Sequence, residues 1–356
     1  MVFSKKETLI TKGVGIIFLY LHHLFSDSSI YSGFTVNFYP FTEQEVFTFS
    51  IFSKICVAIF VFLSGYGNAR SKANTKREIR TKTQNVKGSL RKLLSLSFDY
   101  WFIFILLQIT SFLGRSQIEV YGTGAKAILY FIIDFFGLAS LYNTPTFNPT
   151  WWYMTLAFII IIIMPLLLNA YRIYGVLLVF MSIFIPRLLL LDLGMIFWYL
   201  PALVLGIWCA NENILERIKA LSIVPLYIGN KIIKLIMTIT ILIWLYFLRN
   251  NFSGWVELWD AIIAFLITYF CFEFLSHIPI LCYLLEQMGK HSMNMFLTHT
   301  FIFYFYFRSF TFSFSHFILI LVVLVADTLI LSIFIEKIKE LTRFNTLKNT
   351  VITRFL

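Results

Sequence analysis

Charged residues are scarce in this sequence. Asp, Glu, Lys and Arg make up 13% of the 356 residues, whereas 59% of the residues are hydrophobic. A soluble globular domain carries roughly 25% charged and about 45–50% apolar residues, so this chain has too little charge to cover a water-facing surface. The composition excludes a secreted disulfide scaffold, a soluble enzyme, a disordered hub and a nucleic-acid binder, despite a formal net charge of +11.

Paired cysteines and a cleavable leader are also missing. The four cysteines stand alone in apolar stretches, without a C-x-x-C pair. We expect them to be small buried hydrophobic side chains and not disulfides or metal ligands, so no metal site is predicted. Lys12 and two histidines interrupt the first apolar block, and no small-residue cleavage pattern follows it. We therefore expect this block to stay in the mature chain.

Long apolar blocks dominate the rest of the sequence. About 20 apolar residues cross the hydrocarbon core of a bilayer as one helix. Eleven candidate blocks lie near residues 9–25, 46–66, 93–113, 126–141, 151–169, 174–191, 195–210, 231–248, 258–276, 293–311 and 316–336. No internal repeat or low-complexity tract separates them. The sequence predicts an all-α, polytopic membrane helix bundle that forms a single transmembrane domain over residues 1–356.

Positive charge gathers in alternate segments. Nine Lys and Arg residues lie in segment 70–92, others precede the first block or lie in 212–234 and 337–356, and 26–45 has none. Because cytoplasmic loops carry the excess of Lys and Arg, the loop 70–92, the tail 337–356 and both termini are predicted to be cytoplasmic. Five blocks lie between the first two basic loops, where an even number must cross. We expect 126–141 to be a re-entrant or interfacial helix at the outer face, which leaves about ten spans.

Ionisable residues in the first block are the strongest candidates for function, because such residues are costly inside a membrane. Lys12 and His23 are about 20° out of phase on a helix and roughly 16 Å apart along its axis. Both would face one interior channel, the cation near the cytoplasm and the imidazole toward the outer side. His22 points about 100° away. Asp27, one turn after His23, returns to that face and could orient its imidazole.

A structural interpretation of these residues stays open. Lys12 could extend to the cytoplasmic interface, and the histidines could mark the outer interface. The tryptophans that open the block at 151–169 could likewise belong to an interfacial aromatic belt.

Polar and aromatic residues at the ends of other blocks are further candidates for a substrate or structural pocket. Ser292 is expected to cap the N-terminus of a helix, and His299 would then lie about two turns inside the membrane and need a polar partner. Together with His22, these candidates are Ser64, Tyr66, Trp151, Trp152, Ser292 and His299.

The basic loop has two interpretations. Its cations between Lys72 and Lys82 are typical of a topology signal that contacts anionic lipid. Lys87, Arg91 and Lys92 lie at the mouth of the third span, where a cationic cluster could hold the phosphates of a polyanionic cytosolic cofactor.

The segment from Lys12 to His23 resembles the first-helix signature of the membrane-bound acyltransferase-3 family, in which a basic residue precedes a histidine. That family usually has Arg at the first position; Lys keeps the charge without the bidentate fork. Segments 57–66, 89–94, 148–153 and 289–299 are similar to later parts of the family pattern, in the same order.

The resemblance implies ten spans with cytoplasmic ends, and transfer of an acyl group, commonly acetyl, from acyl-CoA (acetyl-CoA) to a hydroxyl of an extracytoplasmic glycan. Acyl-CoA would be a co-substrate, held by Lys12, Arg91, Lys92 and Lys87. His23 would be a general base or acyl carrier oriented by Asp27. The expected surroundings are membrane lipid and a glycan acceptor, with no nucleic acid, in a bacterial plasma membrane. The oligomeric state stays open, a homodimer included.

Two rival functions explain the same composition. A transporter of a sugar or lipid-linked glycan would also need many spans and buried charges. It predicts inverted repeats with paired broken helices, and the sequence has no such symmetry. A membrane scaffold for glycan synthesis would not need Lys12 and His23 in phase.

Overall fold

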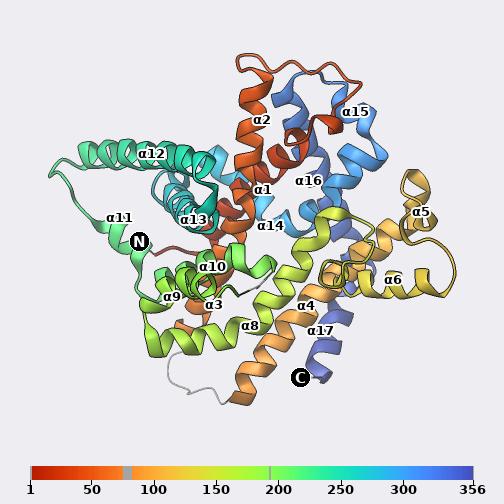
Figure 1. The fold of residues 1–356 in the computed structure, drawn as a ribbon, viewed down its shortest axis with the longest axis horizontal. Coiled ribbons are helices and arrows are strands. Elements are labelled where there is room, and N and C mark those ends of the chain that lie inside the picture. The colour runs from red at the N-terminus through yellow and green to blue at the C-terminus, as the bar shows by residue number, and fades with distance from the viewer. Residues whose placement is uncertain (1, 75–81, 192–193, 356) are drawn as a thin grey trace. The chain divides into compact units, whose positions relative to one another are not determined.

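A computed structural model describes residues 2–74, 82–191 and 194–355 (Figure 1). Helices follow one another along nearly all of this part of the chain. The described residues contain no strand, apart from an isolated bridge between Asn37 and His316. The predicted all-α class is therefore confirmed.

Contacts group the chain into two compact units that interleave along the sequence. Unit 1 comprises Met1–His22, Thr48–Glu78 and Leu166–Ser292, and unit 2 comprises His23–Phe47, Ile79–Pro165 and Met293–Leu356. Each unit is described separately below. A single transmembrane domain over 1–356 stays a prediction.

The helices divide between the units as follows. Unit 1 contains α3 (Cys56–Asn74), α9 (Leu177–Leu188), α10 (Met195–Asn211), α11 (Ile214–Ala220), α12 (Tyr227–Asn251) and α13 (Val256–Glu273). Unit 2 contains α4 (Lys82–Ile109), α5 (Gln117–Tyr121), α6 (Ala125–Phe135), α7 (Ala139–Tyr142), α15 (Arg308–Phe312), α16 (Phe317–Leu341) and α17 (Phe344–Phe355). Residues of both units occur in α1 (Lys5–Phe25), α2 (Glu43–Phe52), α8 (Trp152–Tyr174) and α14 (Pro279–Thr300).

The helices are long and apolar enough for a multi-pass membrane protein. Seven helical stretches among the described residues could cross a bilayer, or eight if the bent pair α10 and α11 is one span. The helix α9 has 12 residues and is too short for this test. The helix α6 has 11 residues, too few for one crossing, which agrees with its omission from the predicted spans. Ten crossings stay a prediction.

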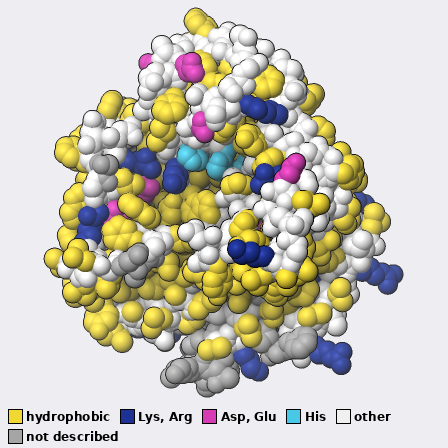
Figure 2. Space-filling view, turned by 45° about the vertical axis from the view of Figure 1, so that its right-hand side comes forward, with side chains coloured by type: hydrophobic (Ala, Val, Ile, Leu, Met, Phe, Trp, Pro, Cys, Tyr) yellow, Lys and Arg dark blue, Asp and Glu magenta, His cyan; other side chains and the backbone are white. Residues whose placement is uncertain are grey.

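Exposed side chains support a lipid environment. Large apolar side chains such as Ile236 and Trp244 on α12, and Ile330 and Phe334 on α16, are more than half exposed. Figure 2 shows hydrophobic side chains over much of the face in view, with Lys and Arg side chains between them. A water-soluble monomer rarely exposes such continuous apolar surface, whereas lipid tails satisfy it.

Unit 1 is held by close contacts between helix backbones. In α3 and α10, a Cβ atom at Gly65 would collide with the carbonyl oxygen of Leu203, and one at Gly206 would collide with that of Phe62. Small residues at a crossing let two helices approach closely, which is how helices associate in lipid. Gly65 therefore belongs to a helix crossing.

A second crossing in unit 1 joins α1 to α14. A Cβ at Gly13 would collide with the backbone of Leu285, and one at Gly289 would collide with the backbone of Leu9. This packing explains why one prediction was wrong: Ser292 does not cap a helix, because α14 already begins at Pro279 and continues through Ser292. Gly289 serves close packing within the helix and does not interrupt it.

The core of unit 2 is aromatic. Trp151 lies fully buried against Tyr100, Phe104 and Phe301, with ring centroids 5.3 to 5.9 Å apart. Edge-to-face and tilted pairs of this kind are favourable beyond the area that they bury. The start of α8 is thereby fixed against α4 and the end of α14.

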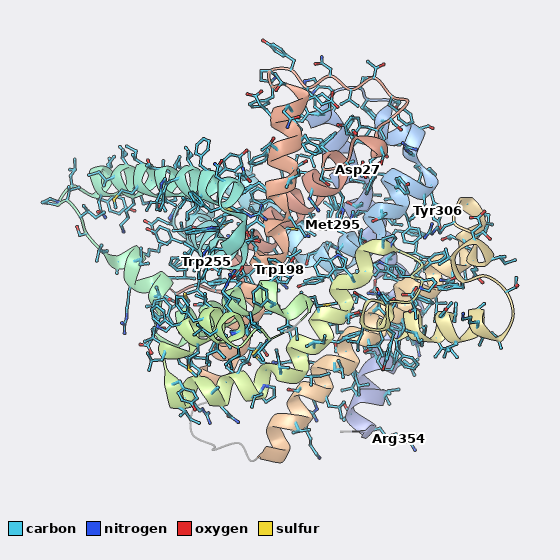
Figure 3. All side chains as sticks on the ribbon, viewed as in Figure 1. Asp27, Trp198, Trp255, Met295, Tyr306 and Arg354 are labelled. Carbon is cyan, nitrogen blue, oxygen red and sulfur yellow. The ribbon has the colours of Figure 1, made fainter. Side chains whose placement is uncertain are left out.

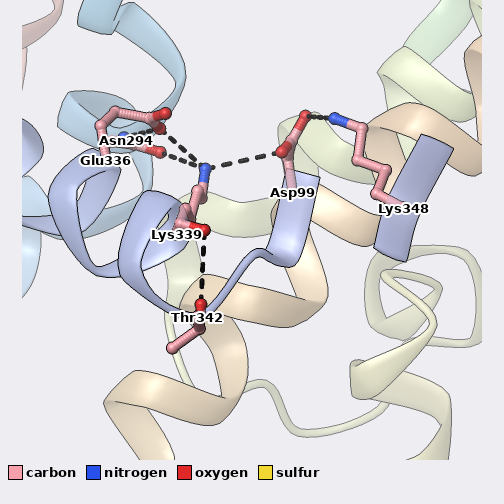
Figure 4. Close-up of polar contacts among 6 residues, drawn as sticks. All are labelled: Asp99, Asn294, Glu336, Lys339, Thr342 and Lys348. Atoms are coloured by element: carbon pink, nitrogen blue, oxygen red, sulfur yellow. Dashed lines mark hydrogen bonds and ion pairs between the residues drawn. The ribbon is translucent and has the colours of Figure 1, made fainter. Parts of the chain in front are cut away.

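A polar cluster ties the C-terminal helices of unit 2 to α4 and α14 (Figure 4). The Lys339 ammonium, 3% exposed, lies 2.8 Å from Glu336 Oε1 and 3.5 Å from both Asp99 Oδ1 and Asn294 Oδ1. Lys348 on α17 donates to the other Asp99 oxygen at 2.6 Å. Two cations and two carboxylates therefore neutralise one another at this place.

We expect Gly65→Ala to destabilise the protein by about 1–3 kcal/mol, because the added methyl group forces α3 and α10 apart. Gly67→Ala is the matched control: apart from the adjacent residues and backbone of its own helix, no heavy atom of the described residues lies within 4 Å of its Cβ position, and an interior helical glycine costs about 0.5–1 kcal/mol relative to alanine. Thermal unfolding in detergent measures both. Equal midpoints for the two variants would contradict the crossing.

We expect Lys339→Met to lower the free energy of unfolding by about 1–3 kcal/mol. This is less than the loss expected on breaking a fully buried ion pair, because Glu336 and Asp99 are 43% and 26% exposed. Lys337→Met is the control on the same helix, since Lys337 and its partner Glu340 are 62% and 71% exposed and such pairs contribute about 0–1 kcal/mol. The two unfolding midpoints should differ by several degrees. A loss that is no larger for the Lys339 variant would show that the cluster is not stabilising.

Candidate functional site

The predicted catalytic histidine lies near the end of a continuous helix. The helix α1 extends without a break from Lys5 to Phe25. The helical spacing that placed Lys12 and His23 on one face therefore applies, and both side chains are half-buried. Gly13, next to Lys12, is fixed by the crossing with α14.

Within unit 2, the ring of His23 packs against the ring of His299. Their centroids are 5.1 Å apart and the rings are inclined by 42°. His299, near the end of α14, is fully buried. The structure thus brings together two of the histidines that the sequence analysis selected separately.

Hydrogen bonds define the tautomer of His299. Its Nδ1 lies 2.6 Å from the carbonyl oxygen of Phe296. A carbonyl can only accept, so Nδ1 carries the proton and Nε2 is the acceptor. Thr300 Oγ1 lies 3.3 Å from Nε2 and donates to it. His299 therefore has the polar partners that its burial demands.

A change in helix type follows directly. Residues Phe301–Tyr306 continue α14 as a π-helix, η7. Short π-helical segments interrupt α-helices frequently at functional sites. The segment thus marks the residues around His299 as a candidate site on geometry that is independent of the histidines.

The Trp-rich segment contacts the same part of α14. Asn148 caps the short 3-10 helix η4 (Pro149–Trp151) by accepting from the backbone N–H of Thr150. The indole N–H of Trp151 donates to the carbonyl oxygen of Leu297 at 3.1 Å. Trp151, predicted as a pocket residue, therefore joins the start of α8 to α14. The contact on α14 is at Leu297, two residues before His299.

A buried chain of polar side chains continues from His299, and the sequence analysis missed it. Thr150 Oγ1 donates to Asn148 Oδ1 at 3.0 Å and lies 3.4 Å from Thr300 Oγ1; because Thr300 donates its proton to His299, the two hydroxyls are in contact without a hydrogen bond between them. Asn148 is fully buried, and its Nδ2 has no hydrogen-bond partner among the described residues. The sequence offered one signal for these residues: Thr150 directly precedes Trp151, and Thr300 directly follows His299.

Asp27 lies in the turn that follows α1. Its Oδ1 accepts from the backbone N–H of Ser29 at 2.9 Å and caps the 3-10 helix η1 (Ser28–Ile30). Hydrogen bonds from the backbone and the hydroxyl of Ser29 lower the pKa of the exposed Asp27 carboxyl. Figure 3 shows Asp27 and Arg354 toward opposite ends of unit 2; an outer position for Asp27 and a cytoplasmic one for the tail stay predictions. Orientation of His23 by Asp27 stays a prediction.

Three other predicted pocket residues form structural contacts in unit 1. The Nδ1 of His22 lies 3.0 Å from the carbonyl oxygen of Ser50. Ser64 donates to the carbonyl oxygen of Phe60 within its own helix. The Tyr66 hydroxyl donates to Glu216 Oε1 at 3.2 Å. Each of these contacts lies within unit 1, and the role of the three residues as pocket residues stays a prediction.

The predicted cofactor-binding cations lie on α4 and α1. Lys87, Arg91 and Lys92 are exposed in the first turns of α4, and Lys87 and Arg91, four residues apart, share one helix face. Residues 75–81 of the predicted basic loop and residue 356 of the tail lie outside the described residues. Trp152 and Ser292 are half-buried.

The cysteines and possible metal ligands are the remaining predicted features. The four cysteines, Cys56, Cys209, Cys271 and Cys282, are free and buried, which confirms their expected role as small hydrophobic side chains. Among the residues that the structure describes, no three His, Cys, Asp or Glu side chains are grouped as metal ligands.

We expect Asp27→Ala to speed amide hydrogen exchange in residues 26–34, because the cap on η1 is lost, whereas Asp27→Ser keeps a capping oxygen and normal protection. A carboxyl with a lowered pKa stabilises the turn above about pH 3.9, and this contribution is lost as the pH falls through the lowered pKa. Exchange of the wild-type turn should therefore approach that of Asp27→Ala in acid. Equal exchange in all three proteins at neutral pH would exclude the cap.

Comparison with known proteins identifies a family. A family model described as an acyltransferase domain, of the acyltransferase-3 family, matches residues 10–337. No curated protein and no solved structure matches the chain significantly. The match includes α1 with its two histidines, the Trp-rich segment and His299. The chain belongs to the acyltransferase-3 family of membrane proteins.

Proposed function

We propose that this protein is a membrane O-acyltransferase, with acetyl as the acyl group. It moves the group from cytosolic acyl-CoA to a hydroxyl of an extracytoplasmic polysaccharide or its lipid-linked precursor. The observation that carries the proposal is the pair His23 and His299, with ring centroids 5.1 Å apart, inside an acyltransferase domain. The proposed location is a bacterial plasma membrane.

His23 acts as general base in the simpler mechanism. Its neutral imidazole accepts the proton of the acceptor hydroxyl, and the hydroxyl oxygen attacks the thioester carbonyl. The carbon–sulfur bond breaks, the ester forms, and the CoA thiolate takes up a proton. An imidazole with a pKa of about 6.5 is suited to such transfer near neutral pH.

His23 carries the acyl group in the alternative mechanism. Its ring nitrogen attacks the thioester and displaces CoA, and the acceptor hydroxyl then attacks the acyl-imidazole to form the ester and regenerate His23. Both mechanisms need the same donor, acceptor and histidine, so the proposal holds for either.

His299 acts as a positioning residue for His23. Its Nδ1 proton is engaged by the Phe296 carbonyl and its Nε2 by Thr300, so the ring has a fixed orientation. The tautomer that these two hydrogen bonds define is neutral, and a neutral neighbour does not oppose a positive charge on His23. Asp27 has a second positioning role, at the turn that ends α1.

Cations at the cytoplasmic side hold the donor. Lys87, Arg91 and Lys92 are exposed on α4, and Lys and Arg bind phosphates by charge-assisted hydrogen bonds. Lys12, which lies on the same face of α1 as His23, is a further cation that we assign to the CoA phosphates. The anionic CoA and the polar acceptor then meet His23 from opposite sides.

We expect His23→Gln to lower acetylation by at least about 100-fold, the contribution of a general base or more. His22→Gln is the matched control: it changes the adjacent histidine, and the carboxamide can still donate to the carbonyl oxygen of Ser50. Two measurements check this, O-acetyl content of surface glycans in cells and CoA release from acetyl-CoA by purified protein.

Normal acetylation by the His23 variant, with loss only in the His22 variant, would overturn the assignment. Wild-type protein that neither consumes acetyl-CoA nor gains thermal stability from CoA in detergent would favour the rival transporter instead.

A further inference from the structure

A cavity of about 220 Å³ lies in unit 2, in the region predicted to be outside the membrane. The loop between α6 and α7, the residues that follow α7, and the start of α8 form its walls. Trp151 and Trp152 line one part, and hydroxyl and carboxamide side chains line the rest. Its volume equals that of about seven water molecules, which is enough for one pyranose ring.

Buried hydrogen bonds make the walls rigid. Asp134, 1% exposed, accepts from the Tyr121 hydroxyl, from Thr146 Oγ1 and from the backbone N–H of Phe147. Thr155 on α8 donates to the carbonyl oxygen of Gly137. The carboxylate of Asp134 on α6 therefore joins three segments: α6 itself, the short helix α5 and the residues just before the Trp-rich segment. A preformed cavity loses less entropy when it binds a ligand.

The lining selects a neutral, polyhydroxylated ligand. The described lining residues include no Lys or Arg, and Asp134 is the only acid among them, so an anion has no counter-charge. Ser140 and Asn143 line this cavity. Their side chains form no hydrogen bond with another described residue, so both are available to bind a ligand. The half-buried indole of Trp152 beside a few polar groups suits a sugar ring, which has apolar C–H faces and hydroxyl edges.

We propose that this cavity is a subsite for a neutral sugar ring of the acceptor glycan, next to the ring that is acylated. The inference rests on the proposed function. Trp151 links the two places, because it lines the cavity and donates to Leu297, two residues before His299. Thr150, adjacent to it, contacts Thr300. The proposed subsite is therefore in direct contact with the segment that packs on α14 beside His299.

The test measures sugar binding without any acyl donor. The probes are the methyl β-glycosides of glucose and N-acetylglucosamine, detected by saturation-transfer NMR on protein in a detergent without a sugar headgroup, such as lauryldimethylamine oxide. We expect saturation of the ring protons of at least one probe. Loss of one neutral hydrogen bond should weaken that binding roughly 3- to 10-fold.

Two variants remove polar groups with little risk to the fold. Asn143→Gly deletes the carboxamide at a residue with φ of 55°, a conformation that glycine adopts readily. Ser140→Ala deletes the hydroxyl. Tyr142→Ala is the control, since Tyr142 is exposed and does not line the cavity. The expected result is weaker binding in the first two variants and unchanged binding in the control.

The outcomes separate the subsite from the proposed function. No binding of either probe, or equal binding in all variants, overturns the subsite. Sugar binding that depends on Asn143 and Ser140, in a protein that never consumes acetyl-CoA, supports the subsite and overturns the acyltransferase proposal. Acyl transfer whose KM for a glycoside acceptor is the same in Asn143→Gly and wild type supports the enzyme and overturns the subsite.

Discussion

Close contact between helix backbones is the constraint on which this fold depends. Lipid tails are as apolar as the helix surfaces, so helices gain little hydrophobic free energy from packing on one another. Gly13 and Gly289 in one crossing, and Gly65 and Gly206 in the other, leave room for a partner backbone where a Cβ would collide. Lys12 adjoins the first crossing. Its position on α1 relative to α14 is therefore set by van der Waals contact and not by its charge.

Unit 2 meets a second constraint, because polar side chains buried away from water need partners. His299 with Thr300, and Thr150 with Asn148, form two hydrogen-bonded pairs that satisfy most of their polar groups together with nearby backbone. These pairs have few alternative arrangements, since a rotation of His299 or Thr150 leaves a further buried group unpaired. The same hydrogen bonds that make burial tolerable therefore hold the His299 ring in one orientation.

Periodicity and charge predicted the helical class, the short helix in 126–141 and the shared face of Lys12 and His23, because these follow from local spacing. Predictions from local spacing were wrong where a residue type that is typical of one structural role had another role in the fold. Gly289 and Ser292 suggested a helix start, yet close packing keeps α14 continuous there. Asp134 suggested only a weak span, yet it joins three segments. Pairs such as Thr150 and Thr300 have no local pattern, so the sequence could not indicate them.

Acyl transfer adds a requirement that the surroundings of His299 help to meet. A thioester or an acyl-imidazole is lost if water reaches it before the acceptor does, so the reacting groups must be shielded. The ring of His299 stacks on Phe303 with centroids 5.9 Å apart and lies 6.2 Å from that of Phe296. These apolar faces leave the His23 side as the polar face of the pair. In the mechanism that we propose, an acceptor hydroxyl held by its sugar ring competes with water at that face, because an oriented nucleophile has a higher effective concentration than a free one.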